Sequence, residues 1–170
     1  IISEGTILRF SEKAMLISQS PIQAIGSEKK PIVFMAQKSS WPGMFISNAK
    51  KFSRLEHVSI QGTRGVGEEG DLKGINRGGW FLTGGTTFYK SPVDLKNCKI
   101  EHSLAEDSLN IISARFNIHN STFTHNQSDG FDGDFVDGNI SDCSFSNIGG
   151  DGIDLSGSAV LIKNTKVINT

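Results

Sequence analysis

Apolar and polar residues alternate over short stretches along the chain, and the alternation recurs at a regular interval. Segments rich in Ile, Val, Phe and Thr alternate in polarity, which predicts β-strands, and no stretch of ten or more residues keeps helical spacing. Pairs of apolar residues five positions apart recur as Leu55 and Ile60, Leu95 and Ile100, Ile118 and Phe123, Ile140 and Phe145, and Ile162 and Val167. Three acidic segments, at 107–110, 129–132 and 151–154, follow each other at steps of 22 residues. A fixed period in this range predicts a solenoid, in which each repeat buries its apolar face against its neighbours.

The period predicts an all-β fold, a single-stranded right-handed parallel β-helix of about seven coils, each of roughly 22–25 residues and three short strands. Residues one period apart then lie one above the other, about 4.8 Å apart. Asn97, Asn120 and Asn164 share one such column, together with His57 and Asp142. Because Asn tolerates the left-handed conformation and its amide can bond to the next coil, this column predicts a ladder at a tight bend.

The pattern indicates one domain over residues 1–170. Residues 1–61 give early irregular coils, residues 62–92 a glycine-rich loop excursion and a strand, and residues 93–170 the regular coils. The sequence opens in an apolar segment and closes in mid-pattern, whereas solenoids need polar end caps. We therefore expect a region of a longer protein, with flanking domains of the same chain as partners, that is secreted, periplasmic or on the cell surface.

Composition narrows the classes of partner. The net charge is −1 and only 21% of residues are charged, so neither a nucleic-acid nor a membrane-surface footprint is indicated. No apolar run reaches the length of a membrane-spanning helix. Cys98 and Cys143 fall in the same inward column two coils apart, about 9 to 10 Å, which is too far for a disulfide. They are expected to be buried thiols.

The acidic repeats place one column of side chains in the core and the next on the outside. The inward column is Leu109, Phe131 and Ile153, and the outward column is Asn110, Asp132 and Asp154, with Asp134 further along the same face. Two carboxylates about 5 Å apart are unfavourable unless one is protonated or a cation lies between them. Three interpretations follow: Ca²⁺ ligands, with Asp129 joining Asp132 and Asp154; acid/base work on a sugar; or solvated charges.

The other candidate residues have both a structural and a functional interpretation. Asp107, Asp129 and Asp151 precede strands, where Asp commonly stabilises a turn by bonding its own backbone. His102 and His125 stack in neighbouring coils, as a polar ladder or with His125 as a base.

The excursion offers a possible substrate clamp. Arg77 could bind a uronate carboxylate bidentately, and Trp80 could stack on a sugar ring. One register places Asn76 in the column of Asn110. In the alternatives, Arg77 lies in a solvated loop, Trp80 packs this loop onto the helix, and residues 80–82 (WFL) form the strand in place of the register with Asn76.

The sequence resembles the pectin-lyase-like superfamily of right-handed parallel β-helix proteins. Residues 5–10 (GTILRF), 31–34 (PIVF) and 55–60 (LEHVSI) look like the opening coils of bacterial secreted members, and the Asp-Gly-Phe/Ile-Asp units look like its generic repeat. The resemblance implies that substrate and calcium sites lie on the strands beginning at Asp107, Asp129 and Asp151. The Gly-His-Gly of polygalacturonases, the Asp-Pro-His-Asp of mannuronan epimerases and the Trp-Ile-Asp-His of pectate lyases are absent, so no named activity transfers.

Two hypotheses of different class remain. In the first, the chain binds or acts on an acidic polysaccharide as a lyase, epimerase or hydrolase, with Asp132, Asp154, Asp134 and His125 as the reactive groups and Ca²⁺ as a possible cofactor. Arg77, Asn76, Asn110 and Trp80 would then bind substrate. In the second, it is a non-catalytic structural or spacer β-helix of a larger bacterial surface or polysaccharide-assembly protein.

Overall fold

The computed structural model describes residues 1–66 and 83–170, which form three parallel sheets and contain no helix. Sheet 1 has the order β1 (Ile7–Phe10), β4 (Ile32–Ala36), β7 (Val58–Gln61), β10 (Lys99–Glu101), β13 (Thr122–Asn126), β16 (Ser144–Ile148), β19 (Lys166–Ile168). Sheet 2 has the order β2 (Met15–Ser18), β5 (Gly43–Ser47), β8 (Thr86–Tyr89), β11 (Asp107–Ile112), β14 (Asp129–Asp134), β17 (Ile153–Ser156). Sheet 3 has the order β3 (Gln23–Ile25), β6 (Ser53–Glu56), β9 (Val93–Lys96), β12 (Arg115–His119), β15 (Asp137–Ser141), β18 (Ala159–Lys163).

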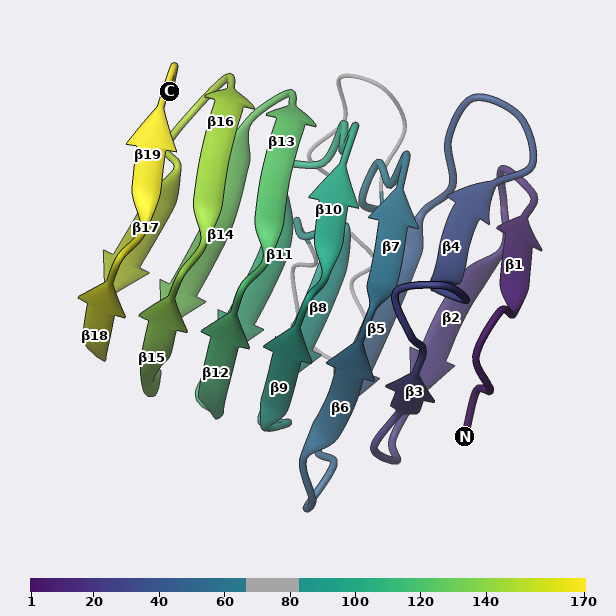
Figure 1. Ribbon diagram of the computed structural model, residues 1–170, viewed down its shortest axis with the longest axis horizontal. Helices are drawn as coiled ribbons and strands as arrows, with labels where there is room; N and C mark the ends of the chain where they lie inside the picture. Colours follow the sequence, from purple (N-terminus) through teal and green to yellow (C-terminus); the bar gives the residue numbers. More distant parts are fainter. Residues whose placement is uncertain (67–82) are drawn as a thin grey trace.

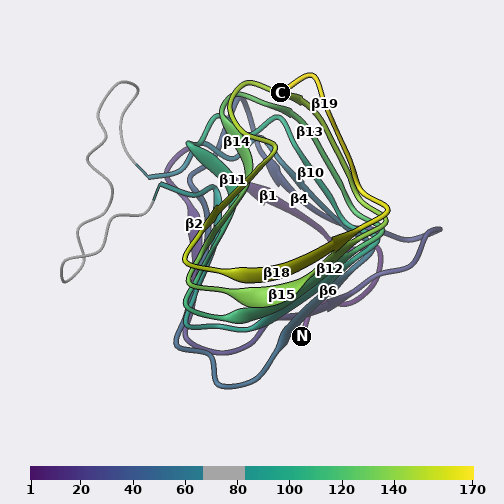
Figure 2. The same cartoon turned by 90° about the vertical axis from the view of Figure 1, so that its left-hand side faces the viewer.

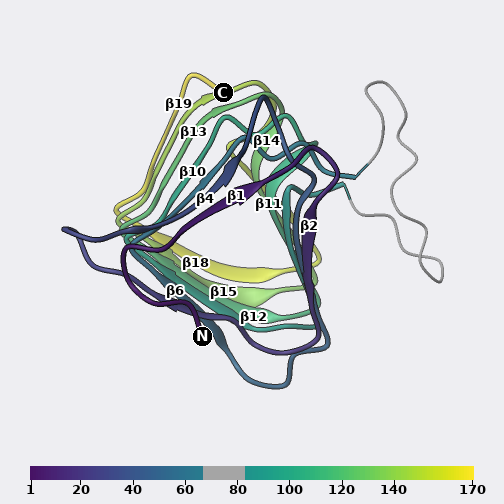
Figure 3. The ribbon, with the colours of Figure 1, turned by 90° about the vertical axis from the view of Figure 1, so that its right-hand side faces the viewer.

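The chain visits the three sheets in turn and climbs by one strand in each at every turn (Figure 1). The result is a β-solenoid of six turns and a final strand, β19, close to the predicted seven coils. Figures 2 and 3, from the C-terminal and N-terminal ends, show a triangular cross-section. In Figure 2 the chain runs anticlockwise through β18 and then β19 as it comes toward the viewer. This is the right-handed sense that the sequence predicts.

The core is a column of apolar side chains inside the triangle. Strand β12 shows its origin, because Phe116 and Ile118 are buried while the residues on either side of them are exposed. Phe123 and Phe145 stack across neighbouring coils with ring centroids 4.5 Å apart. The inward column that the sequence predicts is confirmed, since Leu109 and Phe131 are fully buried and Ile153 packs against the core.

From β13 onward, each corner bends at one residue in the left-handed conformation, and the left-handed non-glycine residues of the described chain have φ between 45° and 57°. The corner between sheets 3 and 1 carries the predicted ladder: Nδ2 of Asn120 donates to Oδ1 of Asn97 at 2.7 Å, and the amide of Asn97 lies 2.9 Å from Nε2 of His57. Nδ2 of Asn164 donates to Oδ1 of Asp142 at 3.3 Å. The corner between sheets 2 and 3 carries a second column, formed by Asn48, Lys90, Ser113, Phe135 and Gly157.

The two cysteines are buried, unpaired thiols, as the sequence predicts. Burial raises the pKa of the Cys98 thiol to about 12, so it stays protonated and unreactive at neutral pH. Its backbone N–H is bound by the hydroxyl of Ser121 at 3.1 Å, from the coil between the two cysteines. Neither thiol is exposed enough to take part in surface chemistry.

The structure was also searched for helices that could cross a membrane. Within residues 1–66 and 83–170, no helix has the length and hydropathy that a membrane span requires.

Candidate functional site

The outward face of sheet 2 carries the acidic column in the predicted register. Asn110 in β11 pairs with Thr87 on one side and Asp132 on the other, and Asp132 pairs in turn with Asp154. Asp134 pairs with Ser156 two residues further along. The parallel strands therefore set four polar side chains side by side across β8, β11, β14 and β17.

Asp132 is the centre of this face. It is half-buried, and Nδ2 of Asn110 donates to its Oδ2 at 2.7 Å. Burial raises the pKa of the Asp132 carboxyl to about 7, and repulsion from Asp107, Asp134 and Asp154 adds to this, against a lowering by the Asn110 bond. Asp132 therefore exchanges its proton near neutral pH.

Asp107 lies at the start of β11 and is only 4% exposed. The hydroxyl of Thr83 donates to its Oδ2 at 2.7 Å. Burial raises the pKa of Asp107 to about 6, with the Thr83 bond lowering it and the charges of Glu106 and Asp129 raising it. Its hydrogen-bond partner is thus a residue of the preceding coil, where the sequence favoured a bond to its own turn.

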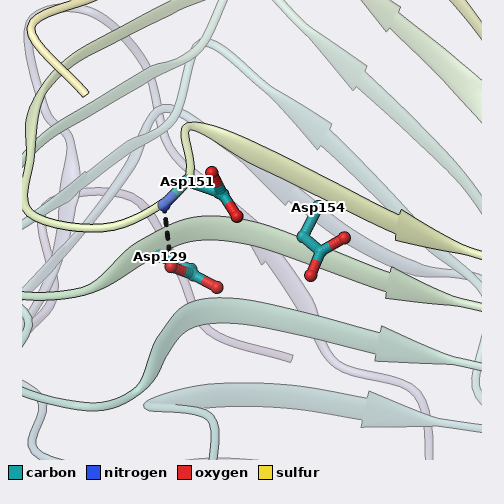
Figure 4. Close-up of side chains that lie close together, drawn as sticks. All are labelled: Asp129, Asp151 and Asp154. Carbon is teal, nitrogen blue, oxygen red and sulfur yellow. Dashed lines mark hydrogen bonds between the residues drawn. The ribbon is translucent and has the colours of Figure 1, made fainter.

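A second acidic group lies at the C-terminal end of this face (Figure 4). One carboxylate oxygen from each of Asp129, Asp151 and Asp154 lies within 4.8 Å of the others. The backbone N–H of Asp151 also donates to Oδ1 of Asp129 at 2.8 Å, which ties the two turns together. Carboxylate oxygens at this spacing fit the ligands that Ca²⁺ takes. This group includes Asp129 and Asp154 of the predicted calcium set, but it contains Asp151 where the sequence placed Asp132.

The other site residues predicted from the sequence differ in their exposure and in their contacts. Asn110 is buried, and its amide is engaged with Asp132, so it positions that carboxyl and offers little surface to a polymer. His125 is exposed at the corner between sheets 1 and 2, where its ring lies 5.3 Å from that of His102 and 3.0 Å from the Thr124 hydroxyl. These contacts form the predicted polar stack. Asn76, Arg77 and Trp80 lie outside the described residues.

Two groups of this site were not assigned a chemical role from the sequence. Thr83 lies outside the 22-residue repeats, so the repeat does not predict it as the hydrogen-bond partner of Asp107. Asp151 was interpreted as a turn residue, and only the three-dimensional arrangement shows it beside Asp129 and Asp154. The spacing Asp-x-x-Asp in the last two repeats was the one available signal.

The face combines a carboxyl that titrates near neutrality, other acidic side chains beside it and a fixed amide donor. A group of this kind can take up or release a proton at physiological pH, which is what general acid/base catalysis requires. Carboxyls shifted by burial and by like charges are also typical of functional sites. No protein-family model, no curated protein and no solved structure matches the sequence.

Proposed function

We propose that this β-solenoid binds an acidic polysaccharide along the outer face of sheet 2 and acts on it by proton transfer through Asp132. The observation that carries the proposal is the in-register column on that face. Asp132 is fixed there by Asn110, between strands that also carry Asp107 and Asp154. The pKa of Asp132, about 7, suits a base that must be free at neutral pH and must also hold the proton it removes.

The chemistry of uronate polymers fits such a group. Elimination and epimerisation both begin with removal of the proton on the carbon next to the sugar carboxylate, and the resulting negative charge must be stabilised. Asp129, Asp151 and Asp154 would hold a Ca²⁺ ion that could neutralise a sugar carboxylate. The resemblance to pectin-lyase-like β-helices, and the extracellular location of such polymers, agree with a secreted or surface protein.

The test is an assay of the whole chain on polygalacturonate and on alginate, with Ca²⁺ and with chelator. Unsaturated products and altered uronate composition are both measured. We expect turnover that rises with pH through about 7, where Asp132 loses its proton. Asp132→Asn should abolish it, because an amide cannot accept the proton.

Asp94→Asn is the matched control, since Asp94 is a partly exposed carboxylate on sheet 3, away from this face. Equal turnover by wild type and Asp132→Asn would exclude Asp132 as the base. If the wild type neither binds nor alters any of these polymers, the proposal is wrong. Binding without turnover would favour a structural role for the solenoid.

A further inference from the structure

The corner between sheets 2 and 3 is hollowed into an open groove of about 520 Å³. It runs across four successive coils, because its walls come from the turns that follow β5, β8, β11 and β14. The groove residues that matter here are Lys50, Lys90, Ser113, Arg115, Phe135 and Asp137. With strands about 4.8 Å apart, four coils span about 14 Å along the solenoid axis.

Three neighbouring coils each contribute one cation to this groove: Lys50, then Lys90, then Arg115. All three side chains are exposed. In the described part of the chain, no carboxylate lies within 4.0 Å of any of them, whereas Lys30, Lys96 and Lys99 each have a carboxylate partner.

Aromatic rings support two of these cations. Nζ of Lys90 lies 5.1 Å from the centre of the Tyr89 ring, and Cζ of Arg115 lies 5.7 Å from that of Phe52. The positive charge is thus held in place, with one acid, Asp137, in the same wall.

Phe135 adds an aromatic surface to the groove. It is 69% exposed and has a φ of 53°, a conformation that is unfavourable for a bulky residue. The other positions of this corner column are Asn48, Lys90, Ser113 and Gly157, so the bend itself does not require an aromatic ring. The ring lies against Gly157, because a Cβ placed there would be 2.8 Å from it. An exposed ring kept at a strained position is suited to stacking on a ligand.

We propose that this groove binds an acidic glycan in an extended conformation, parallel to the solenoid axis, with successive carboxylates on Lys50, Lys90 and Arg115 and one sugar ring on Phe135. The rise of one coil is close to the length of one sugar unit, so one cation per coil matches one carboxylate per sugar. The planar guanidinium of Arg115 can hold a carboxylate by two hydrogen bonds.

The inference rests on the proposed function and supplies what that function lacks, a source of attraction for an anionic polymer beside an acidic face. Asp132 lies in β14 and Phe135 is the corner residue directly after that strand, so at most about 10 Å of chain separates them. A polymer held in the groove therefore lies next to the carboxyl column.

Binding to an oligogalacturonate is measured by titration calorimetry, with its methyl ester as an uncharged ligand of the same shape. A heparin oligosaccharide tests sulfate groups, and single-stranded DNA tests phosphates. The groove variant exchanges the three cations for glutamine (Lys50→Gln, Lys90→Gln, Arg115→Gln). We expect its Kd for oligogalacturonate to rise at least about tenfold, since three charge-assisted contacts are lost.

The control variant removes three exposed cations elsewhere (Lys13→Gln, Lys29→Gln, Lys163→Gln), and its Kd should stay within about twofold of wild type because only long-range, salt-screened attraction changes. Phe135→Ala should weaken binding of the acidic glycan by several-fold without changing the dependence of Kd on salt, because it removes stacking and no charge.

Equal affinity of the groove variant and the wild type would overturn the proposal, as would equal affinity for the methyl ester or tighter binding of heparin or DNA. Loss of affinity in the groove variant with no turnover by the wild type supports the groove and refutes catalysis by Asp132. Turnover that depends on Asp132 and is untouched in the groove variant refutes the groove alone.

Discussion

Replacing Asp107 by asparagine should stabilise this protein at neutral and alkaline pH and leave its stability almost unchanged in acid. Asparagine has the shape of the protonated carboxyl, and its amide oxygen can still accept the hydrogen bond from the Thr83 hydroxyl. The substitution therefore removes the buried negative charge and little else.

The size of the effect follows from the pKa of Asp107, which burial raises from 3.8 to about 6. Between these pH values the folded chain keeps a proton that the unfolded chain has released, so the stability of the wild type falls as pH rises through this window. A shift of about two units corresponds to about 3 kcal/mol, fully lost above pH 6. For a chain of this size, that difference raises Tm by roughly 6–12 °C.

The assay is thermal and urea unfolding followed by circular dichroism, from pH 4 to pH 8. Wild type and Asp107→Asn should agree near pH 4 and separate as pH rises, with the variant more stable at pH 8. Asp94→Asn, a change at a partly exposed carboxylate, should stay within about 0.5 kcal/mol of wild type throughout. A variant that is less stable than wild type at pH 8, or a gap that does not change with pH, would refute the assigned cause.

Two further predictions concern the scaffold, and both are measured as the free energy of unfolding in urea. Phe123→Ala should cost about 3–5 kcal/mol, because it empties one position of the stack in which its ring lies 4.5 Å from that of Phe145. The control is Ile168→Ala, a change at an exposed side chain. A loss below about 1 kcal/mol for Phe123→Ala would contradict a packed core. Asn120→Ala should cost about 1–2 kcal/mol, because it loses the bond to Asn97 and places alanine in the left-handed region, at a φ of 45°. Asn120→Gly, which tolerates that φ, should cost less, and the opposite order would show that the bend is not left-handed.

The fold could be predicted because one period controls every layer of it. Residues 22 apart are adjacent across neighbouring strands, so Asn110, Asp132 and Asp154 had to form a row once the solenoid was recognised. The strands at residues 7–61 were predicted by alternation alone, although their coils are longer and less regular. The left-handed corner at Asn97, Asn120 and Asn164 followed from residue type.

The electrostatic and surface features were less accessible to sequence reasoning. The hydrogen-bond partner of the buried Asp107 is Thr83, which the repeat does not place beside it. The groove cations fall in turns with no common motif, since the glycine-rich excursion interrupts the spacing between Lys50 and Lys90. Phe135 occupies a left-handed position that composition would assign to Asn or Gly, so its exposure was visible only in three dimensions.

In the coils from β13 onward, one left-handed residue at each corner makes the length of this molecule adjustable in whole turns. Because these coils repeat every 22 residues, a duplicated block such as 121–142 would re-enter the sheets in phase and extend the phenylalanine stack by one ring. A single residue inserted into a strand would instead turn the side chains that follow it inside out as far as the next corner. We therefore expect lineages of this chain to differ by entire coils, and to keep smaller insertions at the corners.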